Sequence, residues 1–212
     1  MKRIIIADDH AVVRTGLQLI LEETDEMEVC GEASNGEELL NNLINNNYDL
    51  LILDASMPGK DGIDLLRDVK KISPCMPVVI FTMNNDNHYA IRMIKAGASA
   101  FINKETKTEY IIIALRRVLS GKHYFSPEQS ELLAEIVSEP HKFEQLPHEQ
   151  LTDREFQIMF LLATGLKNGE IAEKLKISKN TIANHRAALL RKMNMESNSD
   201  LTRYAIRQGI IE

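Results

Sequence analysis

Short apolar runs alternate with longer amphipathic stretches along the first 122 residues of this 212-residue chain. The apolar runs fall at residues 3–8, 27–33, 49–54, 77–82 and 99–103. Each run is followed by a stretch with helical periodicity, near residues 11–23, 36–46, 61–72, 86–96 and 106–120. An apolar run bounded by turn-forming residues is typical of a buried strand in a parallel sheet, and the amphipathic stretch is typical of the helix that leads to the next strand. The pattern therefore predicts five βα units that form one α/β domain over residues 1–122.

The alternating pattern stops after this domain. A further helix is predicted near residues 127–138, and it ends before Pro140. The polar segment that follows favours an extended connection. We therefore predict a linker over residues 123–147 that contains this helix, and we expect His141 and His148 to be exposed to solvent.

Two segments have the spacing of a capping box, in which a Thr and a Glu three residues later satisfy free backbone N–H groups of a first helical turn. Thr106 and Glu109 predict that the fifth helix of the α/β domain begins there. Thr152 and Glu155 predict a well-defined start for a helix that ends at Gly165.

Residues 148–212 predict a small all-helical domain. After its first helix, a short helix over residues 168–175 is followed by a turn and by a longer helix over residues 179–194. A helix fits the major groove of DNA, which is about 12 Å wide. The alternative interpretation is a helical bundle with a charged face.

Charge is distributed unevenly along the chain. The net charge is −6 in total, with −9 on residues 1–149 and +3 on residues 150–212. An acidic first part and a basic second part indicate two domains with different partners, and a nucleic acid is a candidate partner for the second domain. The two cysteines lack metal-ligand spacing, and the apolar N-terminal run is too short for a signal peptide or a membrane span. We therefore expect a cytoplasmic protein that does not contact a membrane.

Polar residues stand at the ends of four of the predicted strands. Asp8 and Asp9 end the first strand, Asp54 ends the third, Thr82 ends the fourth, and Lys104 follows the fifth. Parallel strands bring their carboxyl ends to one edge of the sheet, so we expect these five side chains to form one site. Three neighbouring carboxylates repel one another unless a divalent cation that prefers oxygen ligands lies between them, which indicates Mg²⁺.

This set of residues suits the transfer of a phosphoryl group. Asp54 can act as a nucleophile toward phosphorus when Mg²⁺ and the Lys104 ammonium neutralise the charge on the phosphoryl oxygens. The Thr82 hydroxyl can then donate a hydrogen bond to the phosphoryl group. Each residue also has a purely structural interpretation, because Asp8 or Asp9 can cap a helix, Thr82 is an ordinary strand residue, and Lys104 can be a solvated charge.

The same residues resemble the receiver domain of bacterial two-component response regulators. The resemblance covers residues 1 to about 122 and depends on Asp8-Asp9, on Asp54 within the segment Asp-Ala-Ser-Met-Pro-Gly, on Thr82 and on Lys104. It implies a flavodoxin-like fold, a five-stranded parallel sheet with the strand order 2-1-3-4-5. It also implies that Asp54 accepts a phosphoryl group from a histidine kinase.

The resemblance assigns further roles around Asp54. It implies that Asp8 and Asp9 hold Mg²⁺ together with the backbone carbonyl of Ser56. It also implies that Thr82 and Phe101 rearrange after phosphorylation.

The C-terminal residues resemble the LuxR-type helix-turn-helix domain. The resemblance depends on Leu151–Glu155, Ala163–Ala172, Ile177–Ile182 and His185. With the receiver, the whole chain resembles a response regulator of the NarL/FixJ type, a family of transcription factors that dimerise on DNA through the last helix, here residues 198–208. Ala183 and Asn198 depart from the residues that are frequent at these positions.

We expect the helix over residues 179–194 to contact double-stranded promoter DNA. Thr181 and Asn184 lie near its start, where side chains can reach base edges. We expect the other contacts to be mainly with phosphates, from Lys179, His185, Arg186, Arg191 and Lys192, with packing as the alternative role for His185.

The prediction is therefore a transcriptional regulator whose DNA binding is controlled by phosphorylation of Asp54, which promotes dimerisation, release of the DNA-binding domain, or both. Two alternatives differ in class. One is an interaction module that binds DNA constitutively. The other is an aspartyl-phosphate hydrolase, which requires a second acid two residues after the nucleophile, where this chain has Ser56. We expect no enzymatic turnover.

Overall fold

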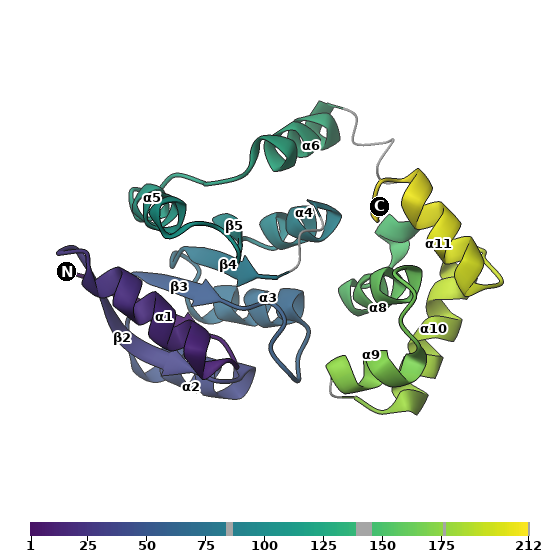
Figure 1. Ribbon diagram of the computed structural model, residues 1–212, viewed down its shortest axis with the longest axis horizontal. Helices are drawn as coiled ribbons and strands as arrows, with labels where there is room; N and C mark the ends of the chain where they lie inside the picture. The colour runs from purple at the N-terminus through teal and green to yellow at the C-terminus, as the bar shows by residue number, and fades with distance from the viewer. Residues whose placement is uncertain (84–86, 139–145, 176, 212) are drawn as a thin grey trace. The chain divides into compact units, whose positions relative to one another are not determined.

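The computed structural model describes residues 1–83, 87–138, 146–175 and 177–211. Contacts between Cα atoms divide the chain into two compact units, the first built around a sheet and the second around the C-terminal helices. The sheet is parallel, with the strand order β2-β1-β3-β4-β5, which confirms the predicted order (Figure 1). Its strands are β1 (Lys2–Ala7), β2 (Met27–Ala33), β3 (Leu50–Leu53), β4 (Val78–Thr82) and β5 (Ala100–Asn103).

Helices cover both faces of this sheet. Helices α1 (Ala11–Glu22) and α5 (Thr108–Leu119) lie on one face, and α2 (Gly36–Asn45) and α3 (Gly62–Ile72) lie on the other (Figure 1). Helix α4 (Asn87–Lys95) connects β4 to β5.

Side chains of the central strand β1 alternate between the two faces and are buried on both. Ile4 and Ile6 join Leu17 and Leu115 in a core cluster on the face that α1 and α5 cover. Ile5 points to the opposite face and is also fully buried. This burial on both sides explains why the strands are almost continuously apolar in sequence.

The predicted capping box at the start of the fifth helix is wrong. Helix α5 begins at Thr108, two residues after Thr106, and its N-cap residue Lys107 makes no side-chain capping bond. The reason is a turn that follows β5, in which the Asn103 side chain accepts a hydrogen bond from the backbone N–H of Glu105 at 2.6 Å. The backbone N–H of Thr106 also donates to the Asn103 carbonyl, so the turn uses the N–H group that the Glu109 side chain would accept in a capping box.

The C-terminal unit is helical. Its elements are α6 (Pro127–Ser138), a short 3-10 helix η1 (Pro147–Gln150), α8 (Asp153–Ala163), α9 (Asn168–Lys174), α10 (Lys179–Met193) and α11 (Asn198–Arg207). Thr152 and Glu155 form both bonds of the predicted capping box. Helix α8 packs against α10 and α11, with Phe156 and Leu189 fully buried. Among the helices in the described ranges, none has both the length and the apolar character that a membrane crossing requires.

The prediction that His148 is exposed to solvent is wrong. His148 lies in η1 and is completely buried. Its Nδ1 atom is 2.7 Å from the hydroxyl oxygen of Tyr204 in α11, and its ring lies against the ring of Phe156 in α8. The residues around Pro147 therefore pack on the helical unit instead of forming an extended connection. His141 lies outside the described residues.

Candidate functional site

Asp8 and Asp54 lie side by side because Ala7 pairs with Leu53 in the parallel ladder between β1 and β3. Both aspartates are buried, with only 1% and 2% of their surfaces exposed. Asp9 is partly buried, and His10 is exposed. One possible ligand atom from each of Asp8, Asp9, His10 and Asp54 lies within 4.8 Å of the others. The structure therefore brings the three predicted aspartates together at one edge of the sheet.

Lys104 joins two of these aspartates. Its ammonium nitrogen lies 2.6 Å from Asp8 Oδ2 and 2.7 Å from Asp54 Oδ2. Burial by itself lowers the pKa of Lys104, but the hydrogen bonds to Asp54 and Asp8 outweigh burial and leave the pKa above its ordinary value. Lys104 is therefore a permanent positive charge between two buried carboxylates.

Burial dominates the electrostatics of Asp54. It raises the pKa of the Asp54 carboxyl more than the hydrogen bonds from Lys104 and from the Ser56 backbone N–H lower it. The Ser56 N–H donates to Asp54 Oδ1 at 2.8 Å, while Lys104 donates to the other oxygen. Both carboxylate oxygens are thus fixed in position, and the ionised form is held at a cost in free energy.

Thr82 and Ser56 lie next to this group. Thr82 is fully buried at the end of β4, and its hydroxyl oxygen is 3.2 Å from that of Ser56, so one hydroxyl donates to the other. The backbone N–H of Lys104 donates to the Thr82 carbonyl at 2.9 Å, which ties the ends of β4 and β5 together. Phe101, in β5, is buried with 7% of its surface exposed.

A glycine shapes the loop that carries Ser56. A Cβ atom at Gly62 would lie 2.4 Å from the Ala55 carbonyl oxygen, so only glycine allows the start of α3 to approach the end of β3 this closely. The sequence motif Asp-Ala-Ser-Met-Pro-Gly therefore depends on Gly62, which lies beyond it.

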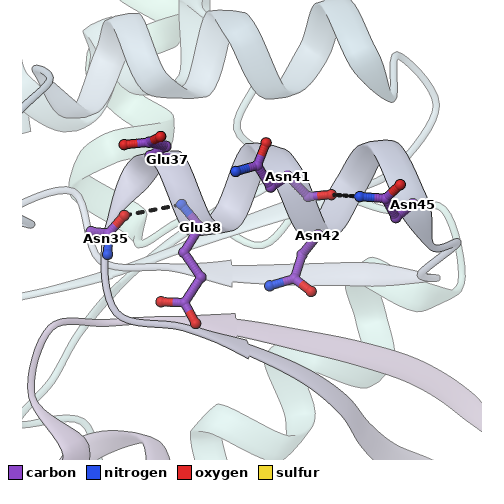
Figure 2. Close-up of a pocket in the computed structure, with 6 residues that line it drawn as sticks. All are labelled: Asn35, Glu37, Glu38, Asn41, Asn42 and Asn45. Carbon is purple, nitrogen blue, oxygen red and sulfur yellow. Dashed lines mark hydrogen bonds between the residues drawn. The ribbon is translucent and has the colours of Figure 1, made fainter.

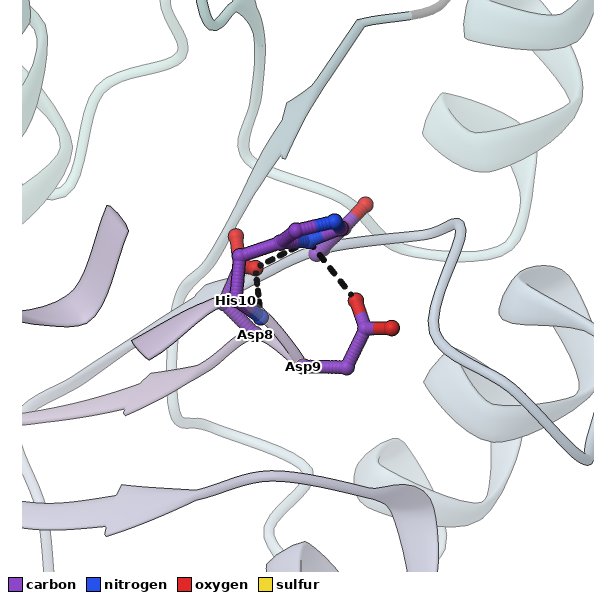
Figure 3. A group of neighbouring side chains, drawn as sticks. Asp8, Asp9 and His10 are labelled. Atoms are coloured by element: carbon purple, nitrogen blue, oxygen red, sulfur yellow. Dashed lines mark hydrogen bonds and ion pairs between the residues drawn. The ribbon is translucent and has the colours of Figure 1, made fainter. Parts of the chain in front are cut away.

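His10 is a member of the site that the prediction missed. Its ring nitrogen Nδ1 lies 3.0 Å from Asp9 Oδ1 and 3.2 Å from Asp8 Oδ1 (Figure 3). Its backbone N–H also donates to Asp8 Oδ1 at 2.9 Å. The signal was present in the sequence, because a residue that follows two strand-end acids has to lie at the same edge of the sheet.

The donor set of this site fits a small divalent cation. Asp8, Asp9 and Asp54 supply carboxylate oxygens, which Mg²⁺ prefers, and the partial exposure of Asp9 leaves room for the waters that Mg²⁺ keeps. The residues present therefore suit the predicted Mg²⁺.

The residues predicted to contact DNA gather on α10, but they differ in surroundings. Lys179, Asn184 and Arg191 are exposed, whereas Thr181, His185 and Arg186 are partly buried. The N-cap Ser178 accepts a hydrogen bond from the backbone N–H of Thr181, which fixes the start of the helix.

Two of the predicted contacts have partners inside the C-terminal unit. The Lys192 ammonium lies 2.6 Å from Oε2 of the buried Glu155, and Arg186 Nε donates to Asn198 Oδ1 at 2.7 Å. Burial raises the pKa of Glu155, but the hydrogen bonds from Lys192 and Thr152 outweigh burial and leave that pKa below its ordinary value. Lys192 therefore links α10 to α8, a role that helical periodicity does not indicate.

A separate concave feature lies along α2. It is a shallow pocket of about 400 Å³, and its lining consists of Asn35, Glu37, Glu38, Asn41, Asn42 and Asn45 (Figure 2). Several of these polar groups already serve the helix, since Asn35 accepts from the Glu38 backbone N–H and the Glu38 carboxylate accepts from Ser34. Asn35 and Glu38 of this pocket therefore serve to cap the helix, and the pocket shares no lining residue with the acidic cluster.

Two protein-family models match the chain. The response regulator receiver domain matches residues 4–116, which is more than half of the sequence. The luxR family of bacterial regulatory proteins matches residues 149–205. The chain belongs to the response regulators of the NarL/FixJ type, with a receiver domain followed by a LuxR-type helix-turn-helix domain.

Characterised relatives match along the whole chain. Oxygen regulatory protein NreC of Staphylococcus epidermidis is 36% identical over 99% of both chains. Response regulator UvrY of Escherichia coli is 32% identical over 99% of this chain and 96% of its own. A solved structure of the response regulator RcsB from Salmonella typhimurium covers 96% of both chains at 29% identity, with a TM-score of 0.67. Another RcsB structure, bound to promoter DNA with the phosphomimetic BeF3−, has a TM-score of 0.64 at 28% identity and covers 96% of this chain and 98% of its own.

Proposed function

We propose that Asp54 accepts a phosphoryl group from a histidine kinase and that this event controls binding of the C-terminal domain to promoter DNA. The observation that carries the proposal is the Lys104 ammonium, which bridges buried Asp8 and Asp54 from a third strand end. Two buried carboxylates that share one ammonium are costly in free energy, whereas an ion pair with a purely structural role can form at the surface without that cost.

In the transfer step, a carboxylate oxygen of Asp54 forms a bond to phosphorus while the bond from phosphorus to the donor's imidazole nitrogen breaks. Burial, which raises the pKa of Asp54, leaves its oxygens poorly solvated and nucleophilic, and Lys104 keeps them ionised. Asp8, Asp9 and the Ser56 carbonyl would hold Mg²⁺, which would supply neutralisation of the phosphoryl oxygens. Lys104 supplies a second positive charge to the same oxygens.

Thr82 and Phe101 are the proposed switch. The Thr82 hydroxyl lies 3.2 Å from that of Ser56, and a reorientation would let it donate its proton to a phosphoryl oxygen on Asp54. Phe101 lies in the neighbouring strand, where a change in its side chain would alter the surface of the receiver domain.

We propose that α10 is the helix that enters the major groove. Thr181 and Asn184 near its start would contact base edges, and Lys179, His185 and Arg191 would contact the DNA or its phosphates. Arg186 is held by Asn198, so it would present its remaining N–H groups to a phosphate. Lys192 would not contact DNA in this proposal, because it forms an ion pair with Glu155 and so joins α10 to α8.

Phosphorylation is proposed to promote dimerisation through α11, release of the DNA-binding domain, or both. Support comes from RcsB, which has been solved as two dimers bound to DNA, with a TM-score of 0.60 at 29% identity. A homodimer places two recognition helices on two half-sites. The domain division at residues 1–122, 123–147 and 148–212, a cytoplasmic location and the absence of enzymatic turnover belong to the same proposal.

Intact mass measurement tests the chemistry. Incubation with acetyl phosphate and Mg²⁺ is expected to add about one phosphate to the wild-type chain and none to Asp54→Ala. A matched control is Asp25→Asn, because Asp25 is an exposed aspartate, and it should be labelled like the wild type. Labelling of Asp54→Ala, or no labelling of the wild type, would overturn the proposal.

A further inference from the structure

We propose that Arg14 is a positioning residue of the acidic site, which holds the loop after β1 so that the Asp9 carboxylate can bind Mg²⁺. The inference rests on the proposed function, because it takes the cation site at Asp8, Asp9 and Asp54 as given. It adds to that site a residue of helix α1 that supplies no ligand atom and acts through the backbone of Asp8.

The sheet fixes the position of Asp8 but ends before Asp9. The backbone N–H of Asp8 donates to the carbonyl of Ala33 at 3.0 Å, which extends the pairing of β1 with β2 by one residue. Lys104 also holds the Asp8 side chain. Asp9 stands two residues beyond the end of β1, in the loop that leads to α1 (Figure 3). The direction of the Asp9 side chain therefore depends on the peptide group that joins Asp9 to Asp8.

Arg14 holds this peptide group. Its Nη1 atom donates to the backbone carbonyl oxygen of Asp8 at 2.7 Å. Because a peptide group is planar, a bond to its oxygen fixes the orientation of the plane, and with it the direction in which the chain continues to Asp9. The Arg14 side chain is only 17% exposed, so water has little access to the guanidinium.

A second contact of Arg14 sets the direction of its guanidinium. The Nε atom donates to Oε2 of Glu32 in β2 at 2.7 Å. A guanidinium is planar and rigid, so a bond at Nε also restricts the direction of Nη1. Arg14 therefore joins the loop after β1 to the neighbouring strand through two fixed hydrogen bonds.

The sign of the expected effect separates positioning from charge. Arg14 is a cation that contacts the backbone of Asp8, so on electrostatic grounds alone its removal should raise the affinity for Mg²⁺. Loss of the hydrogen bond to the Asp8 carbonyl has the opposite effect, because Asp9 then leaves the position that the octahedral geometry of Mg²⁺ demands. The positioning role therefore predicts that the affinity falls when Arg14 is replaced.

The test measures the affinity of the full chain for MgCl₂ by NMR titration. Arg14→Met keeps a long apolar side chain and is expected to lower the affinity about tenfold, because groups that orient metal ligands are worth about 10–100-fold. Arg14→Lys keeps a donor without the rigid fork and should recover part of the loss. In an Asp9→Ala background, Arg14→Met should change the affinity by less than about twofold, because the ligand that Arg14 positions is already gone.

Arg116→Met is the matched control, because Arg116 forms an exposed ion pair with Glu26 and its loss removes the same charge from the same unit. It should keep the affinity of the wild type. An unchanged or higher affinity in Arg14→Met, or an equal loss with and without the Asp9 carboxylate, would overturn the role of Arg14 while the cation site stands. If the wild type does not bind Mg²⁺, the proposed cation site fails and the role of Arg14 falls with it.

Discussion

At the scale of single residues, the acidic site holds charged side chains in a buried environment with little solvent. Asp8 and Asp54 are buried beside each other, and one ammonium, that of Lys104, contacts both. Burial costs the Asp54 carboxylate its hydration, and its hydrogen bonds and attraction to Lys104 offset only part of that cost. Such an arrangement lowers stability, and its retention is understandable if the ionised Asp54 has chemistry to perform.

Asp54→Asn is therefore expected to raise the free energy of unfolding near pH 7 by about 1 kcal/mol, within the range of single stabilising substitutions. Because burial raises the pKa of Asp54, the folded chain binds the proton more tightly than the unfolded chain, and the ionised form is destabilising at neutral pH. The advantage of the variant should vanish as the pH falls below 3.8, the ordinary pKa, where the wild-type carboxyl is protonated in both states. Urea unfolding in the presence of a chelator measures both effects.

Asp25→Asn is the control for this substitution, because Asp25 is exposed and its neutralisation should change stability by less than about 0.5 kcal/mol. A variant Asp54→Asn that is less stable than the wild type at pH 7 would show that the Asp54 carboxylate stabilises the fold. An advantage that persists unchanged to acid pH would show that it does not arise from titration of Asp54.

At the scale of elements, the C-terminal helices are joined by polar contacts that cross between them. Lys192 of α10 pairs with the buried Glu155 of α8, and Arg186 of α10 donates to Asn198 of α11. The Tyr204 hydroxyl of α11 hydrogen-bonds to the buried His148. Arg191 and Lys192 of α10 are both exposed, but Lys192 forms an ion pair with a buried carboxylate.

Lys192→Gln is expected to lower the free energy of unfolding by about 2 kcal/mol, because it leaves the buried Glu155 carboxylate without its cation. The partial exposure of the Lys192 side chain keeps the loss below that of a fully buried pair. Its effect should shrink as the pH falls below 4.5, the ordinary pKa of Glu155. The hydrogen bonds of Glu155 lower its pKa in the folded chain, so their stabilisation is present above that pH and is lost on acidification. Chemical unfolding at several pH values measures this dependence.

Arg191→Gln provides the matched comparison on the same helix. It should change stability by less than about 0.5 kcal/mol, but lower the salt dependence of DNA binding by about one charge. Lys192→Gln should keep the salt dependence of the wild type. If the two variants exchanged these effects, Lys192 would be the phosphate contact and Arg191 the structural residue.

The strands and the residues of the acidic site were predictable from the sequence, because short apolar runs that end at polar residues mark both. Apolar runs ended by polar residues give the strand ends, and parallel topology then brings Asp8, Asp54 and Lys104 together. The start of α5 was not predictable from spacing alone, because the backbone carbonyl of Asn103 accepts the Thr106 N–H that the capping box required. The burial of His148 was not predictable either, since Tyr204 lies 56 positions later in the sequence.

At the scale of the whole molecule, phosphorylation adds negative charge to a chain that is already acidic. The net charge is −6, and the negative charge is concentrated in the first 149 residues. A phosphoryl group adds further negative charge and weakens non-specific attraction to DNA. Any rise in DNA affinity on phosphorylation must therefore come from a conformational change or from dimerisation, not from electrostatic attraction.

Dimerisation is a sufficient source of such a rise. Two recognition helices on one dimer make their contacts at two half-sites, and both the affinity and its salt dependence increase with the number of phosphates contacted. The exposed Ile206 of α11 is an apolar side chain available for such a contact.

The most direct test is the affinity for DNA of the phosphorylated chain, compared with Asp54→Ala treated in the same way. DNA fragments recovered from the genome that encodes the chain supply the probe, and affinity is measured over a range of salt concentrations. The phosphorylated wild type is expected to bind at least about tenfold more tightly than Asp54→Ala, with a steeper dependence on salt, because two half-sites are occupied. Equal affinity of the two proteins would contradict control of DNA binding by phosphorylation of Asp54.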